Sequence, residues 1–215
     1  ASNNTAVGLQ ALLSNTTGAQ NTSTGTESLE ANTTGASNTA HGYAALEANT
    51  TADNNTAFGA YALLRNTTGT RNTAVGASAL DALTTENDNT AIGYSALSSE
   101  VSGFRNTAVG SGAGANQNGG TNNALLGYNA GSDITTGDAN TFIGSDCGDA
   151  TTTASNNTAL GQAALGANTT GGNNTAIGYQ SLLANTTGVE NVAVGRAAAD
   201  SITTGNYNTA IGSDA

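Results

Sequence analysis

The segment NTAIGYQSLLANTTGVE, from Asn174 to Glu190, is one copy of a 17-residue unit that recurs along the whole chain. Its opening motif, Asn-Thr-Ala-aliphatic-Gly or a close variant, begins thirteen times at 17-residue intervals without insertion or deletion. We number the positions of the unit from this Asn. Position one is always Asn: Asn4, Asn21, Asn38, Asn55, Asn72, Asn89, Asn106, Asn123, Asn140, Asn157, Asn174, Asn191 and Asn208. Position five is always Gly: Gly8, Gly25, Gly42, Gly59, Gly76, Gly93, Gly110, Gly127, Gly144, Gly161, Gly178, Gly195 and Gly212.

A unit of this length and composition predicts a β-solenoid. Seventeen residues are too few for the helix pairs of helical repeat proteins, and Gly, Asn and Thr disfavour helices. The Thr-Ala-aliphatic segment alternates like a strand, and Gly at positions five and fifteen is expected in turns that need positive φ. We predict an all-β, parallel β-solenoid (β-roll) of thirteen 17-residue coils, each with two short strands and two turns. Residues 1–215 are expected to form a single tandem-repeat domain without a linker.

Stacked coils place the same position of each unit in one column. Asn above Asn at position one predicts a ladder of side-chain amides, and Gly at position five predicts a structural turn. Position nine is Leu in eight of its twelve copies, whereas Gly114, Gly131 and Gly148 interrupt the column. Large residues near these glycines are expected to restore the lost volume, namely Leu125, Ile134 and Phe142. Ile202 beside Ala199 indicates the same exchange, so positions nine and twelve should border one shared space.

Strand alternation predicts self-association. Positions three and eight are small and positions four and nine are apolar, yet position four should face away from position three. One thin roll cannot bury both sets, and neither end of the sequence departs from the repeat. We therefore expect a homo-oligomer, either a side-by-side homotrimer or an end-to-end filament. The chain is expected to be a segment of a longer fibre or a polymerising subunit.

Charge and composition exclude several classes of partner. The formal net charge is −11 and there is no Lys, which argues against nucleic acid, since nucleic-acid binding needs a basic surface. No apolar run is long enough for membrane insertion. The single cysteine leaves the redox compartment open.

Few residues suggest chemistry, and we expect no catalytic, cofactor-binding or metal site. His41 replaces an aliphatic residue at position four, and Cys147 occupies the small column of position eight as a buried thiol. The nearby carboxylates are interpreted as solvated turn residues rather than a glycosidase pair or calcium ligands; they are Asp133, Asp138, Asp146 and Asp149. Several Asn-x-Thr sequons fall on a turn where a glycan would be tolerated; these begin at Asn15, Asn32, Asn49, Asn66, Asn168 and Asn185.

Two sets of segments resemble known fibre proteins. NTAIGYQSLLANTTGVENVAVGRAAA, from Asn174 to Ala199, resembles the head repeats of trimeric autotransporter adhesins, the YadA-like β-roll. NTFIGSDCGDA and LLGYNAGSDITTGDANTFIG resemble repeats of phage tail-fibre proteins. The resemblance covers essentially the whole chain, although the YadA-like period is shorter than 17 residues. It implies a left-handed parallel β-roll, often trimeric, on a cell or virion surface.

The leading functional hypothesis is therefore a structural or adhesive extracellular fibre segment. Its expected partner is another copy of itself, and a host-surface receptor or glycan is a further candidate partner. The alternative is an ice-binding or other surface-binding solenoid that uses Thr columns at positions two, thirteen and fourteen. A receptor-binding part of a phage tail fibre or a glycan-degrading tailspike is a third hypothesis. Thr-Thr-Gly is more typical of a turn than of a flat face, which favours the fibre.

Overall fold

The computed structural model describes residues 2–215, and within that range it contains thirteen short strands and no helix. The chain forms two compact units, Ala1–Arg105 and Asn106–Ala215. The first unit contains β1 (Thr5–Val7), β2 (Thr22–Thr24), β3 (Thr39–His41), β4 (Thr56–Phe58), β5 (Thr73–Val75) and β6 (Thr90–Ile92). The second contains β7 (Thr107–Val109), β8 (Ala124–Leu126), β9 (Thr141–Ile143), β10 (Thr158–Leu160), β11 (Thr175–Ile177), β12 (Val192–Val194) and β13 (Thr209–Ile211).

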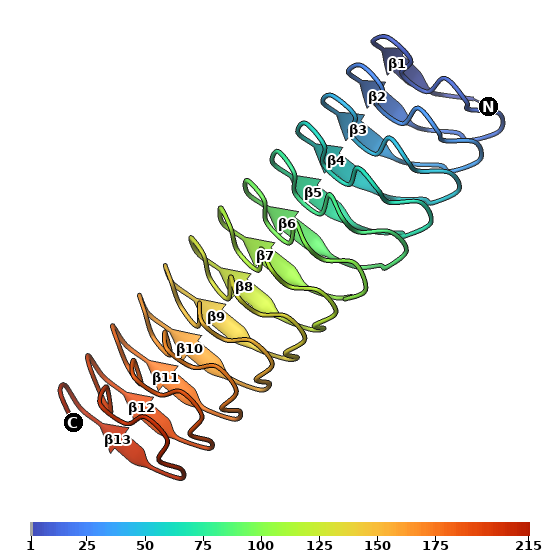
Figure 1. Cartoon of the computed structure of the whole chain (residues 1–215). Helices are drawn as coiled ribbons and strands as arrows, with labels where there is room; N and C mark the ends of the chain where they lie inside the picture. The colour runs from blue at the N-terminus through green and yellow to red at the C-terminus, as the bar shows by residue number, and fades with distance from the viewer. Residues whose placement is uncertain (1) are drawn as a thin grey trace. The chain divides into compact units, whose positions relative to one another are not determined.

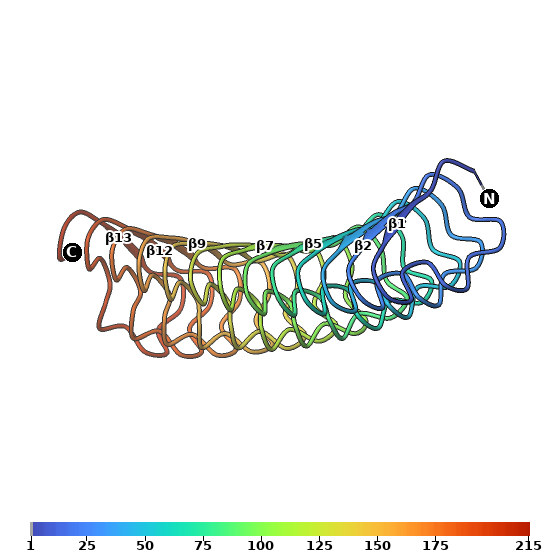
Figure 2. The ribbon, with the colours of Figure 1, turned by 90° about the horizontal axis from the view of Figure 1, so that it is seen from above.

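Within each unit, every strand pairs in parallel with the strand of the next coil. The register is one repeat, as in the pairing of Thr39 with Thr56 in the first unit and Thr158 with Thr175 in the second. In each unit the coils therefore stack one above another, with the strands of that unit along one side (Figures 1 and 2). This arrangement confirms the predicted all-β parallel β-solenoid with one coil per 17 residues.

The prediction of two strands per coil is wrong, because each described coil has a single three-residue strand. The rest of the coil is turn and bend that still bonds to its neighbour, for example from the Leu46 N–H to the Ala62 carbonyl at 3.0 Å. Residues in the left-handed backbone conformation interrupt the extended backbone in this part of the coil. Positions seven, nine and seventeen all have positive φ, and Leu at position nine has φ of 50–57°.

Position five requires glycine for two reasons. Its φ lies between 132° and 144° in every coil, a region that side-chain-bearing residues rarely adopt. A Cβ on Gly178 would also overlap the main-chain carbonyl of Gly195 in the next coil. Position fifteen differs from the prediction, because its glycines do not have positive φ. Gly35 instead lies close to the next coil, and Ala52 shows that a methyl group fits this position.

Each unit encloses a thin core built from positions three, eight and nine. Ala40, Ala45 and Leu46 in one coil have no solvent-accessible surface, and the same columns are buried in the neighbouring coils. Full burial of a Leu side chain contributes roughly 1.5–3 kcal/mol. The position-nine column is therefore the main apolar contribution to stability.

Larger residues fill the space where position nine is Gly. A Cβ on Gly148 would lie 2.5 Å from Cε2 of Phe142, and one on Gly131 would lie 2.8 Å from Cδ1 of Ile134. Leu125 contacts the same space, since its Cδ2 would lie 2.9 Å from that Gly131 Cβ. The predicted exchange of volume between positions three, nine and twelve is confirmed here.

The side-chain amide of Asn at position one bonds mainly to main-chain groups and less often to the amide of the neighbouring Asn. The Oδ1 of Asn157 accepts the backbone N–H of Asn174 at 2.9 Å, and Asn174 Nδ2 donates to the Gly188 carbonyl at 2.8 Å. The same Nδ2-to-carbonyl bond recurs in both units at 2.7–3.0 Å. Contacts between the amides themselves accompany it in some coils only, as between Asn157 and Asn140 at 3.2 Å. Position one thus fixes both the turn and the register.

Candidate functional site

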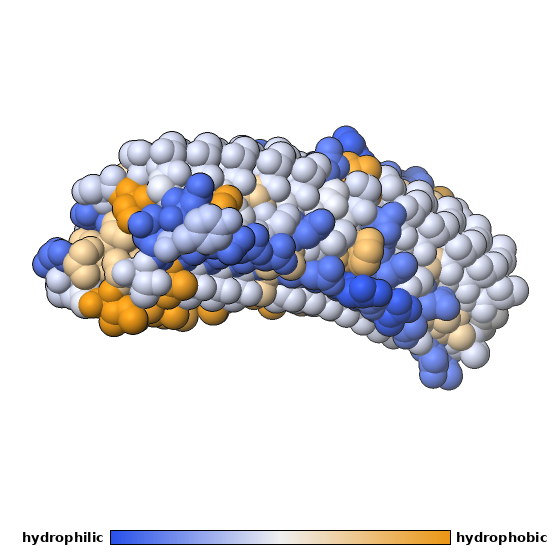
Figure 3. All heavy atoms as spheres, turned by 90° about the horizontal axis from the view of Figure 1, so that it is seen from below, coloured by the Kyte–Doolittle hydropathy of each residue, from blue (hydrophilic) through white to orange (hydrophobic). Residues whose placement is uncertain are grey.

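The outward side of the strands carries two parallel columns of side chains, at positions two and four, which we call the strand face. In the second unit, position four is aliphatic throughout: Val109, Leu126, Ile143, Leu160, Ile177, Val194 and Ile211. Leu126 and Leu160 are both 46% exposed, although a residue on the other side of the same strands, such as Ala159, is fully buried. Figure 3 shows apolar atoms gathered near the last coils of this unit. An exposed apolar column is therefore present beside a complete internal core.

Position two adds hydroxyl groups to the strand face. The position-two Thr hydroxyls, such as those of Thr141 and Thr158, form no hydrogen bond with another group of the described chain. Position thirteen is different, because Thr16 Oγ1 donates to the Thr33 carbonyl at 2.9 Å and this bond recurs along the stack. Of the Thr columns at positions two and thirteen, therefore, only position two leaves its hydroxyls available to a partner.

Aromatic and acidic residues replace the regular columns in the first unit. The rings of His41 and Phe58 stack with centroids 4.6 Å apart, and Tyr43 meets Tyr61 edge-on at 5.3 Å. A hydrogen bond with Glu27 is the largest cause of the raised pKa of Tyr43. His41 is thus an exposed member of the strand face, stacked on its neighbour in the column.

Cys147 lies inside the second unit, in line with the interpretation of a small core residue. It is fully buried, and its Sγ lies 3.4 Å from the Ala159 carbonyl oxygen. Burial raises the pKa of the thiol to about 12, so it is protonated at neutral pH. A neutral buried thiol is a poor nucleophile.

The four carboxylates singled out in the sequence do not converge on one site. Asp138 accepts hydrogen bonds from the main chain and hydroxyl of Thr121, at 2.7 and 2.9 Å. Asp149 lies close enough to Asp146 and Asp133 to feel their charges, although partial burial is the largest cause of its raised pKa. Among residues 2–215, no three His, Cys, Asp or Glu side chains are grouped so that they could hold a metal ion.

For the buried sequons of position twelve, the prediction that a glycan would be tolerated is wrong in the folded state. Asn32 and Asn49 have no solvent-accessible surface, and Asn49 Nδ2 donates to Asn32 Oδ1 at 2.8 Å. Asn66, Asn168 and Asn185 are equally buried, and Asn15 is half-buried. The position-twelve Asn column turns inward, so the amide nitrogen that a glycan needs is engaged in a ladder inside the coil.

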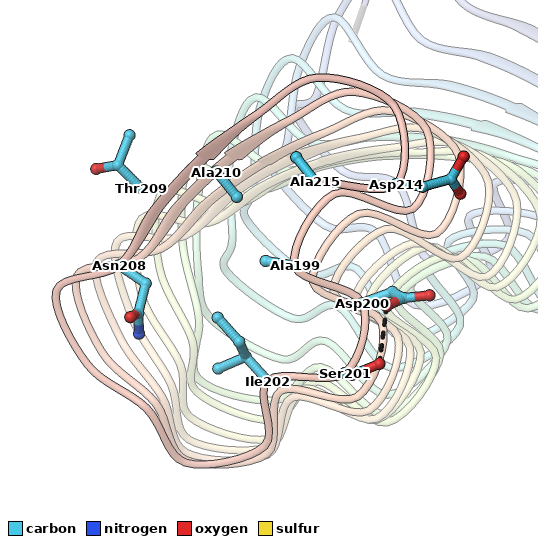
Figure 4. A pocket seen from close by; sticks show the side chains of 9 residues that line it. All are labelled: Ala199, Asp200, Ser201, Ile202, Asn208, Thr209, Ala210, Asp214 and Ala215. Carbon is cyan, nitrogen blue, oxygen red and sulfur yellow. Dashed lines mark hydrogen bonds between the residues drawn. The ribbon is translucent and has the colours of Figure 1, made fainter.

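A pocket opens at the last coil of the second unit. Ala199, Ile202, Ala210 and Ala215 line it with apolar groups, and Asp200 lies at its edge, bonded to a neighbouring hydroxyl (Figure 4). These are positions three, eight, nine and twelve, the same columns that fill the core elsewhere. The pocket is therefore the exposed end of the coil interior rather than a cleft built around reactive groups.

Sequence reasoning identified the columns but did not place positions two and four together as one free surface. Strand alternation was the signal that could have done so, since it directs both positions outward. No helical segment within residues 2–215 combines the length and hydrophobicity needed to span a bilayer. No family model, curated protein or solved structure matches the chain.

Proposed function

We propose that the chain is a structural or adhesive segment of an extracellular, cell-surface or virion-surface fibre, in which copies associate through the strand face. The observation that carries this proposal is the uninterrupted aliphatic column of the second unit. Five of its seven side chains are exposed and Val109 and Val194 are half-buried, although β7 to β12 bury their position-three residues in a core. Contiguous apolar surface on a folded protein marks an interaction site, because water contact with it is unfavourable.

The internal bonding of the coils supports a mechanical role. Within each unit, the position-one Asn of the inner coils combines a bond to the preceding coil with a bond to its own turn, as at Asn174. Repeat stacks of this kind gain their stability from contacts between neighbouring repeats. Such a stack holds its outward columns at a fixed spacing, which suits a spacer or an adhesive surface.

Electron microscopy of the purified chain tests the proposal. We expect filaments or discrete bundles for the natural sequence, and their loss in the double variant Ile143→Lys/Ile177→Lys, which places two charges in the apolar column. The matched control is Thr153→Lys/Thr187→Lys, which adds the same charges to the same two coils at exposed position fourteen. Single dispersed particles for the natural sequence, or equal assembly in all three proteins, would contradict the proposal.

Ice binding is the second candidate, and the free hydroxyls of position two favour it. Thr and aliphatic side chains alternate across the strand face at one spacing per coil, as in the pair Thr158 and Leu160. Such an array offers both hydrogen-bonding and apolar groups to an ordered water surface. Thermal hysteresis by the natural sequence that is lost in Thr141→Lys/Thr175→Lys would support ice binding, whereas none in the natural sequence would exclude it.

A further inference from the structure

The residue after the invariant glycine, at position six, is a second exposed column, and it carries regularly spaced tyrosines. Tyr43 and Tyr94 occupy it in the first unit, with 44% and 66% exposure. Tyr128 and Tyr179 occupy it in the second unit, with 58% and 45% exposure. In both units the two tyrosines are 51 residues apart, which is three repeats of 17.

A hydrogen-bond ladder aligns this column within each unit. In the first unit, the position-seven N–H of a coil donates to the position-six carbonyl of the preceding coil, from Tyr61 to Tyr43 at 2.9 Å and from Ser95 to Ala77 at 3.0 Å. The second unit repeats the pattern, from Gln180 to the Gln162 carbonyl at 3.0 Å. Because neighbouring strands lie about 4.8 Å apart, three coils separate the two tyrosine side chains of each unit by about 14 Å.

The surface between the two tyrosines is low at position six and carries a ring and hydroxyl groups at position seven. Position six is Ala60 and Ala77 between the rings of the first unit, and a third ring, Tyr61 at position seven, stands beside Ala60 and is 42% exposed. Ser78 and Ser95 stand beside them at position seven, and their hydroxyls form no hydrogen bond with another group of the described chain. The two rings can therefore be reached together by one elongated molecule that also meets free hydroxyl groups.

The second unit offers the same combination with other residues. Ser145 and Gln162 lie between its two tyrosines, and Asn129 and Gln180 flank the column at position seven. The side chains of Asn129 and Gln180 make no hydrogen bond within the described residues. An exposed pair of tyrosines with unengaged polar side chains beside it thus occurs once in each unit, with hydroxyls in the first unit and amides in the second.

Pyranose sugars match this chemistry. The C–H groups on one face of the sugar ring are weakly positive and apolar, and they pack against the negative face of an aromatic ring. The hydroxyls at the rim of the sugar need hydrogen-bond partners, which Ser, Asn and Gln supply. A linear glycan also presents identical rings at regular intervals, which a surface of regular period can contact more than once.

Charge narrows the class of glycan. The chain has a net charge of −11, and Asp146 and Glu27 stand at position seven beside the column. Arg196, at position six, is paired with Asp214. An anionic polysaccharide would be repelled by this surface, so the surface favours a neutral one.

We infer that the position-six tyrosines bind a neutral linear polysaccharide that lies along the coil stack and contacts Tyr43 with Tyr94, or Tyr128 with Tyr179. This inference rests on the proposed adhesive function and specifies what is bound. Two contacts on one polymer reinforce each other, because the second contact is intramolecular once the first has formed.

Affinity electrophoresis of the full chain tests the inference, in gels that contain hydroxyethyl cellulose, galactomannan or dextran, with alginate as the anionic comparison. We expect at least one neutral polymer, but not alginate, to retard the chain. Replacing all four tyrosines, as Tyr43→Ala/Tyr94→Ala/Tyr128→Ala/Tyr179→Ala, should weaken that retardation at least about tenfold, as expected for the loss of stacking worth about 1.4 kcal/mol. The control Tyr207→Ala removes a tyrosine that is 72% exposed at position seventeen and should have no effect.

A spacing variant separates the arrangement of the rings from their number. In Tyr43→Ala/Tyr94→Ala/Tyr128→Ala/Ser145→Tyr, the second unit keeps two position-six tyrosines but separates them by two coils instead of three. Its retardation should fall well below that of Tyr43→Ala/Tyr94→Ala. Equal retardation of these two variants, no retardation by any neutral polymer, or a preference for alginate would overturn the inference. Fibres seen by microscopy in a protein that fails this test would leave the proposed fibre function standing.

Discussion

Position five is the position of the coil that tolerates the fewest residue types. Both its φ and its distance from the next coil exclude a side chain, so the invariance of this position along the chain has a local cause. Leu at position nine shows the opposite case. It adopts φ of 50–57°, which costs an L-residue roughly 1–2 kcal/mol. Burial of its side chain offsets that cost.

Gly178→Ala should lower the free energy of unfolding by about 2–4 kcal/mol, because the methyl group adds steric overlap to an unfavourable φ. Gly166→Ala is the matched control, since its φ is not positive and an added Cβ would lie no closer than 3.3 Å to its neighbours. Urea denaturation measures both. Similar losses in the two variants would show that position five has no special requirement.

Ala139→Asn should raise the free energy of unfolding by about 0.5 kcal/mol. Ala139 is exposed at position seventeen with φ of 55°, and Asn tolerates this conformation better than Ala. Ala150→Asn, at a position without positive φ, should give no gain. A gain in both variants would point to a general effect of Asn instead of the backbone conformation.

Cys147 should resist alkylation in the folded protein. At about pH 8, close to the ordinary thiol pKa of ~8.5, iodoacetamide should react only after urea unfolds the chain. The folded pKa of about 12 is higher than the unfolded one. The folded state therefore holds the thiol proton longer, and stability falls as pH rises from about 8.5 to 12. Cys147→Ala should remove that part of the pH dependence, and rapid labelling of the native protein would contradict the burial.

The position-twelve Asn column acts at the scale of one element, because its amides bond from coil to coil. Asn32, Asn49 and Asn66 each donate to the Asn of the preceding coil, at 2.8–3.3 Å. The ladder stops where Leu83 follows, and the Oδ1 of Asn66 is buried there without a partner. Asn185 is in the same situation before Ile202. Interior positions of this ladder should therefore contribute more than its ends.

Asn49→Ala should cost about 2–3 kcal/mol, since it removes two donated bonds and leaves buried partners unsatisfied. Asn15→Ala is the control at the half-buried start of the same ladder and should cost about 1 kcal/mol. Thermal denaturation of the two variants checks the difference. Equal costs would mean that the amides contribute separately and not as a ladder.

The sequence was sufficient to predict the period, the parallel stacking and the exchange of volume around Phe142, because each depends on a strict register of residue types. It was not sufficient to predict the backbone conformation between the strands. Leu at position nine has no preference for positive φ, so nothing in its identity revealed the left-handed turns. The inward position of Asn32 also escaped prediction, because Asn-Thr-Thr-Gly is equally typical of a solvated turn.

At the scale of the whole molecule, association should depend on the strand face and not on the number of charges. The column that includes Ile143 and Ile177 is apolar and exposed, so two lysines there should prevent association while the solenoid stays folded. Lysines at Thr153 and Thr187 in the same coils should leave association unchanged. Circular dichroism of each variant shows whether the fold is kept.

Sedimentation velocity over a wide range of protein concentration tests the central claim most directly. The natural chain should sediment as an oligomer or as growing filaments, and Ile143→Lys/Ile177→Lys should sediment as a folded monomer. The natural chain sedimenting as a stable monomer at every concentration would contradict the claim that its strand face joins copies into a fibre.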